Sequence, residues 1–88
     1  MNIKQQEELF EKILNTLSDY EILILQDAKE QKHKEMFLNF KLEIAPCLLK
    51  MRSIHARLKG FQLLLELDPL NPYFQKMVIN LNKEIYVH

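Results

Sequence analysis

The sequence predicts an all-α fold: a small antiparallel bundle of three or four helices, with a long middle helix broken or kinked near Pro46. The main observation is a seam of nine apolar residues whose spacings alternate between three and four, the pattern of one narrow helix face. The seam consists of Phe37, Phe40, Ile44, Cys47, Met51, Ile54, Leu58, Phe61 and Leu65. In addition, the chain holds only one glycine and three prolines, too few turn formers for a many-stranded sheet. Helix packing is therefore expected to organise the chain.

The length and composition indicate a single helical domain over residues 1–88. Of its 88 residues, 48% are hydrophobic and 27% are charged, close to the average of globular domains. A chain this short buries only roughly 60–65% of the surface that its unfolded form exposes. An interface with a second copy would add buried apolar area, so a homodimer is expected.

The charges balance over the whole chain but not along it. Twelve basic and twelve acidic residues give a net charge of zero, which argues against a general attraction to nucleic acids or to membrane surfaces. Acidic residues are in excess over residues 1–28, and basic residues are in excess over residues 29–59. The longest apolar run, Ile22–Leu25, is far too short to cross a bilayer, and no signal-peptide pattern is present. We therefore expect a cytoplasmic protein with no membrane partner.

The first part of the chain has the pattern of an amphipathic helix over residues 3–16. Ser18–Glu21 then has the pattern of a capping box, which favours a new helix at Ser18 over one continuous helix. The apolar residues Ile22–Leu25 are compatible with a short strand, but no other strand candidate exists to pair with them. Residues 26–35 are polar apart from Ala28, so they are expected to form an exposed helix or a linker.

Pro46 interrupts the seam and leaves two alternatives. Either a helix ends near Ile44 and another begins with Pro46 in its first turn, or one long helix bends at this point. A proline inside a helix costs about 3 kcal/mol or more, because it removes a backbone hydrogen bond and clashes with the preceding turn. The phase of the seam continues through Pro46, which favours a kink or a very tight break.

The end of the chain contains the clearest helix boundary. Two prolines, Pro69 and Pro72, stop one helix and form a turn, after which Asn71 can cap the last helix and Pro72 suits its first position. That helix is expected to run to Tyr86 with one apolar face: Phe74, Met77, Val78, Leu81 and Ile85.

Residues Phe61–Pro72 resemble the turn between two tetratricopeptide repeats, in which Leu-Asp-Pro closes one helix and opens the next. The resemblance covers 12 of the 88 residues. Arg57 stands where the repeat has a small residue, and no second copy of the pattern follows. The resemblance is therefore limited to the turn and implies no family.

The residues that could take part in catalysis or bind a metal do not form a recognisable site. Cys47 lies on the apolar seam with no histidine near it in sequence, which indicates a packed thiol. Glu30 and His33 have the Glu-x-x-His spacing of di-iron bundles, but a second such pair and further glutamates are missing. No hydrolase pattern or phosphate-binding loop occurs. We therefore expect no catalytic residues, no metal, no cofactor and no enzymatic activity.

The sequence thus favours a small protein–protein interaction module, such as an adaptor, a regulator or a chaperone-like subunit, which acts through an apolar helical face. The expected interface residues are Phe40, Met51, Ile54, Leu58 and Phe61. The alternative is a small nucleic-acid-binding regulator whose phosphate contacts would be Lys50, Arg52, Arg57 and Lys59. These cations are spread over both flanks of the seam, whereas a phosphate-binding surface needs them on one outward face.

Overall fold

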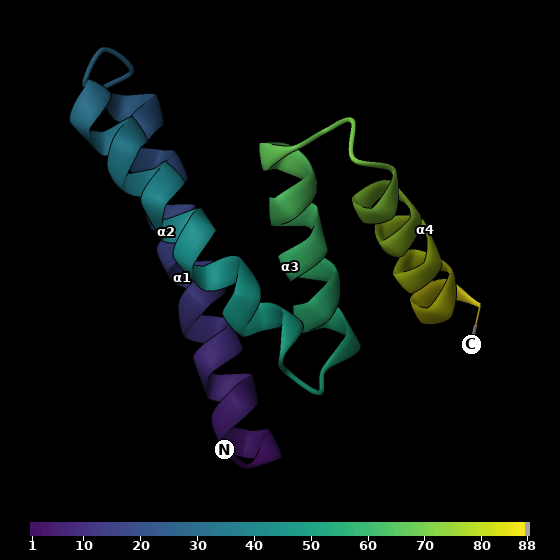
Figure 1. Ribbon diagram of the computed structural model, residues 1–88. Helices are drawn as coiled ribbons and strands as arrows, with labels where there is room; N and C mark the ends of the chain where they lie inside the picture. Colours follow the sequence, from purple (N-terminus) through teal and green to yellow (C-terminus); the bar gives the residue numbers. More distant parts are fainter. Residues whose placement is uncertain (88) are drawn as a thin grey trace. The chain divides into compact units, whose positions relative to one another are not determined.

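A computed structural model describes residues 1–87 of the chain (Figure 1). It contains four helices: α1 (Ile3–Gln26), α2 (Gln31–Leu49), α3 (Ile54–Leu67) and α4 (Pro72–Tyr86). Residues 1–87 include no strand, so the predicted all-α fold is confirmed with four helices. The residues fall into two compact units, Met1–Ile44 (unit 1) and the chain from Ala45 onward (unit 2). Because α2 runs through the boundary between these units, a single domain over residues 1–88 stays a prediction.

Helix α1 is continuous through Ser18, so the break favoured there is wrong. A real capping box forms at the start of this helix, where the Asn2 side chain accepts the Gln5 amide at 2.8 Å and the Gln5 side chain accepts the Asn2 amide at 3.0 Å. A cap at Ser18 would need extended backbone. No glycine or proline interrupts the helix there, and continuing it keeps Tyr20, which stacks on Phe37, on the same face as the buried Leu17.

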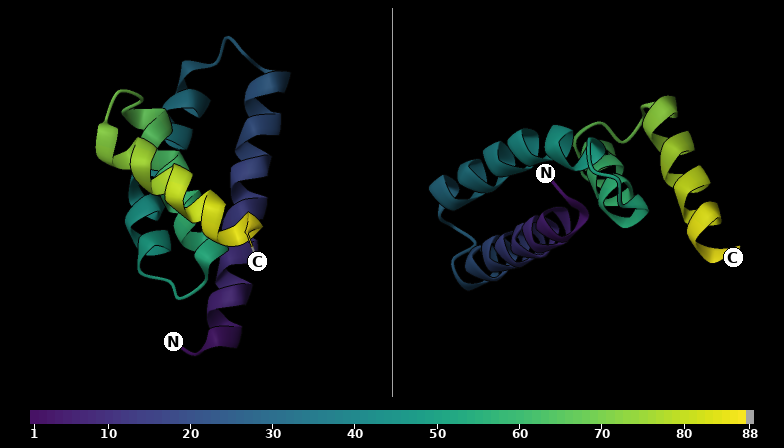
Figure 2. Two further views of the ribbon diagram at one scale, coloured as in Figure 1. Left: turned by 90° about the vertical axis from the view of Figure 1, so that its right-hand side faces the viewer. Right: turned by 90° about the horizontal axis from the view of Figure 1, so that it is seen from below.

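In unit 1 the helices α1 and α2 run antiparallel and side by side (Figures 1 and 2). The ring of Tyr20 on α1 stacks on Phe37 of α2, with centroids 5.4 Å apart, and lies 5.6 Å from Phe40. The ammonium group of Lys41 lies 3.9 Å from the centroid of the Phe37 ring. Residues 27–30 form the turn, and α2 begins at Gln31, so the polar stretch over residues 26–35 is partly linker and partly exposed helix.

The break in the middle of the chain comes after Pro46. Helix α2 includes Pro46 in its last turn, ends at Leu49 and is followed by a short link to the N-cap Ser53, whose hydroxyl accepts the Ala56 amide at 3.4 Å. Pro46 lacks the amide that would bond to the Leu42 carbonyl, but the helix continues past it for its last turn. The tight break therefore lies at residues 50–53, and the seam is divided between α2 and α3.

In unit 2 the antiparallel helices α3 and α4 pack against each other (Figure 1). Leu58, Phe61 and Leu81 form the core of this contact. The Asn71 side chain caps α4 by accepting the amides of Tyr73 at 3.0 Å and Phe74 at 3.2 Å. The predicted start of the last helix and its predicted end at Tyr86 are thereby confirmed.

Candidate protein-interaction surfaces

The seam residues expected to form an interface lie mainly inside the chain. Met51, Leu58 and Phe61 are only 5–9% exposed, and Phe40 and Ile54 are half-buried. Leu58 and Phe61 are held in the core between α3 and α4. A side chain that is buried within its own chain presents little surface to a second protein, so the free surfaces have to be sought elsewhere.

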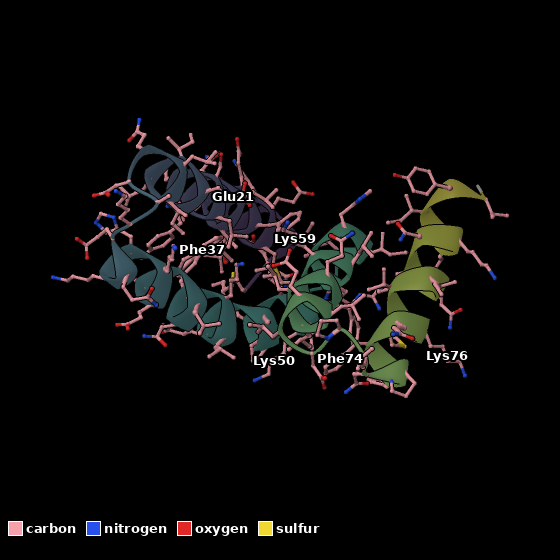
Figure 3. All side chains as sticks on the ribbon, turned by 90° about the horizontal axis from the view of Figure 1, so that it is seen from above. Glu21, Phe37, Lys50, Lys59, Phe74 and Lys76 are labelled. Carbon is pink, nitrogen blue, oxygen red and sulfur yellow. The ribbon has the colours of Figure 1, made fainter. Side chains whose placement is uncertain are left out.

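The four basic residues considered for nucleic-acid contact do not share one exposed face. Lys50 and Arg52 are exposed in the link after α2, whereas Arg57 and Lys59 are half-buried on α3. The Nε atom of Arg57 is shielded from solvent and has no hydrogen-bond partner. Figure 3 shows Lys50 and Lys59 at separate places in unit 2. This arrangement differs from the single outward row of cations that a phosphate backbone requires.

The candidate chemical residues are also separate from one another. Cys47 is half-buried and makes no disulfide. The Glu30 carboxylate accepts the Lys32 amide at 3.1 Å, and His33 is half-buried with its Nδ1 atom unpartnered. Within residues 1–87, no group of three or more histidine, cysteine, aspartate or glutamate side chains is placed to hold a metal ion.

A shallow hollow of about 190 Å³ lies along α1 and was not predicted from the sequence. Its lining includes Thr16, Asp19, Tyr20 and Leu23. The Thr16 hydroxyl donates to the Lys12 carbonyl within the helix at 2.9 Å. Asp19 is the one acidic residue among these four. The hollow is small for a ligand pocket, which commonly has about 300–1,000 Å³.

Exposed apolar residues of α1 share one stripe with acidic residues. The helix turns by about 100° per residue, so residues eleven or seven apart lie almost on one line. The acidic stripe, as we name it, consists of Ile3, Glu7, Leu14, Glu21 and Leu25, all of them exposed. Lys4 and Lys12 lie on other sides of the helix by the same angular count. The surface of the stripe is therefore apolar and negatively charged.

Helix α4 has an equivalent stripe with the opposite charge. Its inner face carries Phe74, Val78 and Leu81 toward the contact with α3. The outer face presents the basic stripe, which consists of Lys76, Ile79, Lys83 and Tyr86 at spacings of three, four and three. Ile79 and Tyr86 are 53% and 82% exposed, and Figure 3 shows Lys76 projecting from the side of α4 away from α3.

A third exposed apolar feature is the α2 patch, formed by Leu38 and Leu42 at 46% and 52% exposure. Phe37 and Phe40 of the same helix turn toward Tyr20 of α1 instead. Residues 38 and 42 are four apart and therefore neighbours on the surface of α2. Their spacing could have revealed the patch from the sequence. The predicted interface followed the longer seam instead, which lies on another side of the helix.

No protein-family model matches the chain, and neither does any curated protein or solved structure. In residues 1–87, no helix combines the length and the apolar content that crossing a bilayer would require.

Proposed function

We propose that the protein is a small non-enzymatic interaction module, an adaptor, regulator or chaperone-like subunit, that binds another protein through an exposed apolar helical surface. The observation that carries the proposal is the α2 patch, where Leu38 and Leu42 stand side by side in solvent on a regular helix. Adjacent exposed leucines are a typical site for the apolar face of a partner helix, which anchors at residues three or four apart.

The small number of buried residues in unit 1 supports the same proposal. Among the described residues of unit 1, only Ile13 and Leu17 are fully buried. Apolar burial is the main favourable contribution to folding and association, at about 25 cal/mol per Å² of area removed from water. A partner that covers Leu38 and Leu42 would therefore stabilise this unit together with the complex.

A protein partner suits this surface better than a nucleic acid does. Protein interfaces have an apolar centre and a polar rim, and the α2 patch is flanked by the exposed polar residues Glu35 and Asn39. The basic residues of the nucleic-acid alternative lie in another part of the chain, and two of the four are half-buried.

The experiment measures the sedimentation of the tagged chain in a lysate of its source organism. We expect the wild-type chain to sediment in a complex larger than the purified chain at the same concentration. The double variant Leu38→Gln, Leu42→Gln should lose this complex and keep its helical circular dichroism, because both side chains are exposed. The matched control Asn80→Gln, on the exposed surface of α4, should keep the complex. Equal sedimentation in lysate and buffer would contradict the proposal.

A further inference from the structure

The acidic stripe of α1 and the basic stripe of α4 are complementary in charge and in spacing. On α1, Glu21 and Leu25 are four residues apart on one exposed line, and on α4 the same is true of Ile79 and Lys83. Each stripe carries charges of one sign only. Both stripes alternate charged and apolar side chains, which is the composition that aligns two helices in one register.

An antiparallel pairing of the two stripes brings together one pair of opposite charge and one apolar pair. With Glu21 opposite Lys83, the equal spacing brings Leu25 opposite Ile79. One turn further, Lys76 comes opposite residue 28, just beyond the end of α1 at Gln26. The register thus joins one apolar pair to one pair of opposite charge, whereas a shift of four residues toward the end of α1 would place Lys83 against Leu25.

The helix dipoles favour the same orientation. The last turn of α1 contains no basic residue, and the first turn of α4 contains no acidic residue, so neither end is neutralised by its own helix. In the antiparallel register the negative C-terminal end of α1 lies near the positive N-terminal end of α4. Lys76 would then lie close to the last turn of α1.

We propose that α4 of one copy docks antiparallel on α1 of a second copy through these two stripes. The proposal goes beyond the proposed function, because it assigns a second copy of the chain to two surfaces other than the α2 patch. A second copy is favoured because each chain carries both complementary surfaces. Unit 1 has nine acidic and six basic residues, and unit 2 has six basic and three acidic residues, so contact between unlike units is also favoured by their overall charge.

The test is a charge swap followed by sedimentation of the purified chain over a range of concentrations at low salt. The wild-type mass should rise above 10.6 kDa with concentration, and salt should reduce the rise. Lys83→Glu and Glu21→Lys, each alone, place like charges opposite each other and should weaken self-association by about tenfold or more. The matched control Lys12→Glu makes the same charge change off the stripe and should associate like the wild type.

Mixing the two single variants gives the decisive result. A Lys83→Glu chain and a Glu21→Lys chain complement each other at both kinds of contact, so an equimolar mixture should associate where neither variant does alone. The double variant in one chain should also associate. Circular dichroism of each variant checks that the helices remain folded.

A wild-type mass of 10.6 kDa at every concentration would overturn the inference. A mixture of the two single variants that stays monomeric would also overturn it. So would single variants that lose stability with no change in mass, because that result indicates that the two stripes pair within one chain. These outcomes leave the proposed function standing, because that function is tested by the α2 patch in lysate and not by self-association.

Discussion

Gly60 shows how one residue sets the approach of α3 to the end of α2. A Cβ atom added at this position would lie 2.9 Å from Cδ2 of Leu49, 3.1 Å from Cβ of Leu48 and 3.2 Å from the Ala45 carbonyl oxygen. The leucine methyl group can rotate away, but the backbone oxygen and the Cβ atom can move only with α2. The absence of a side chain therefore permits the close helix contact within unit 2.

We expect Gly60→Ala to lower the free energy of unfolding by about 1 kcal/mol. Alanine favours a helix over glycine by about 1 kcal/mol, but overpacking a tight contact costs about 1–3 kcal/mol. The unfolding free energy can be measured by urea titration followed by circular dichroism. The control Asn80→Ala, at an exposed position of α4, should raise stability by a few tenths of a kcal/mol at most. A more stable Gly60→Ala protein would show that α2 and α3 are not in close contact.

The candidate surfaces were only partly predictable from single residues. The sequence identified Leu58 and Phe61 as members of an apolar face, and both are buried. It could not show whether that face is internal, because burial depends on which helix covers it. Leu81 and Ile79 illustrate this on one helix, since both are apolar but only Leu81 faces α3 and is buried.

The helix boundaries were predictable wherever the backbone itself requires an interruption. Pro72 cannot continue a preceding helix and Asn71 readily caps a new one, so the start of α4 was predicted correctly. Ser18 forms no such obligatory boundary, because serine also fits inside a helix with its side chain in solvent. The continuous α1 agrees instead with the packing of Tyr20, beyond Ser18, on Phe37 and Phe40 of α2.

The sequence predicted a break near Pro46 but not its residues, because the seam keeps its phase on both sides of the link at residues 50–53. Spacings of three and four describe only side-chain direction, so a short non-helical link that restores the direction leaves no trace in the pattern. The N-cap Ser53 is the local signal that marks this boundary. Pro46 is the more conspicuous helix breaker in the sequence, but α2 includes it and ends only at Leu49.

Removing the N-cap side chain of α4 should lower the stability of the protein. Asn71→Ala removes the acceptor for two amides, at 3.0 and 3.2 Å, and should lower the unfolding free energy by about 1 kcal/mol. Ser53→Ala should cost less, because its single cap bond is long at 3.4 Å. Thermal unfolding followed by circular dichroism measures both variants. A larger loss for Ser53→Ala than for Asn71→Ala would contradict this ranking of the caps.

Helix α2 runs through the boundary between the two units and lacks a backbone donor close to that boundary. The boundary lies between Ile44 and Ala45, and Pro46 follows directly. Proline has no amide hydrogen, so the hydrogen bond that would join residue 46 to the Leu42 carbonyl cannot form. That bond would cross the boundary from unit 2 to unit 1. We therefore expect α2 to bend most readily at this proline.

We expect Pro46→Ala to stiffen this junction and to raise the unfolding free energy by about 1 kcal/mol or more, because alanine supplies the missing donor and Pro46 is exposed. The measurement is the width of the distance distribution between spin labels at Ser18→Cys and Asn80→Cys, in a Cys47→Ala background. The width should decrease in Pro46→Ala and stay unchanged in the control Pro69→Ala, whose proline lies in the turn between α3 and α4. Since the labels lie in different units, an unchanged width in Pro46→Ala would place the motion elsewhere than in α2.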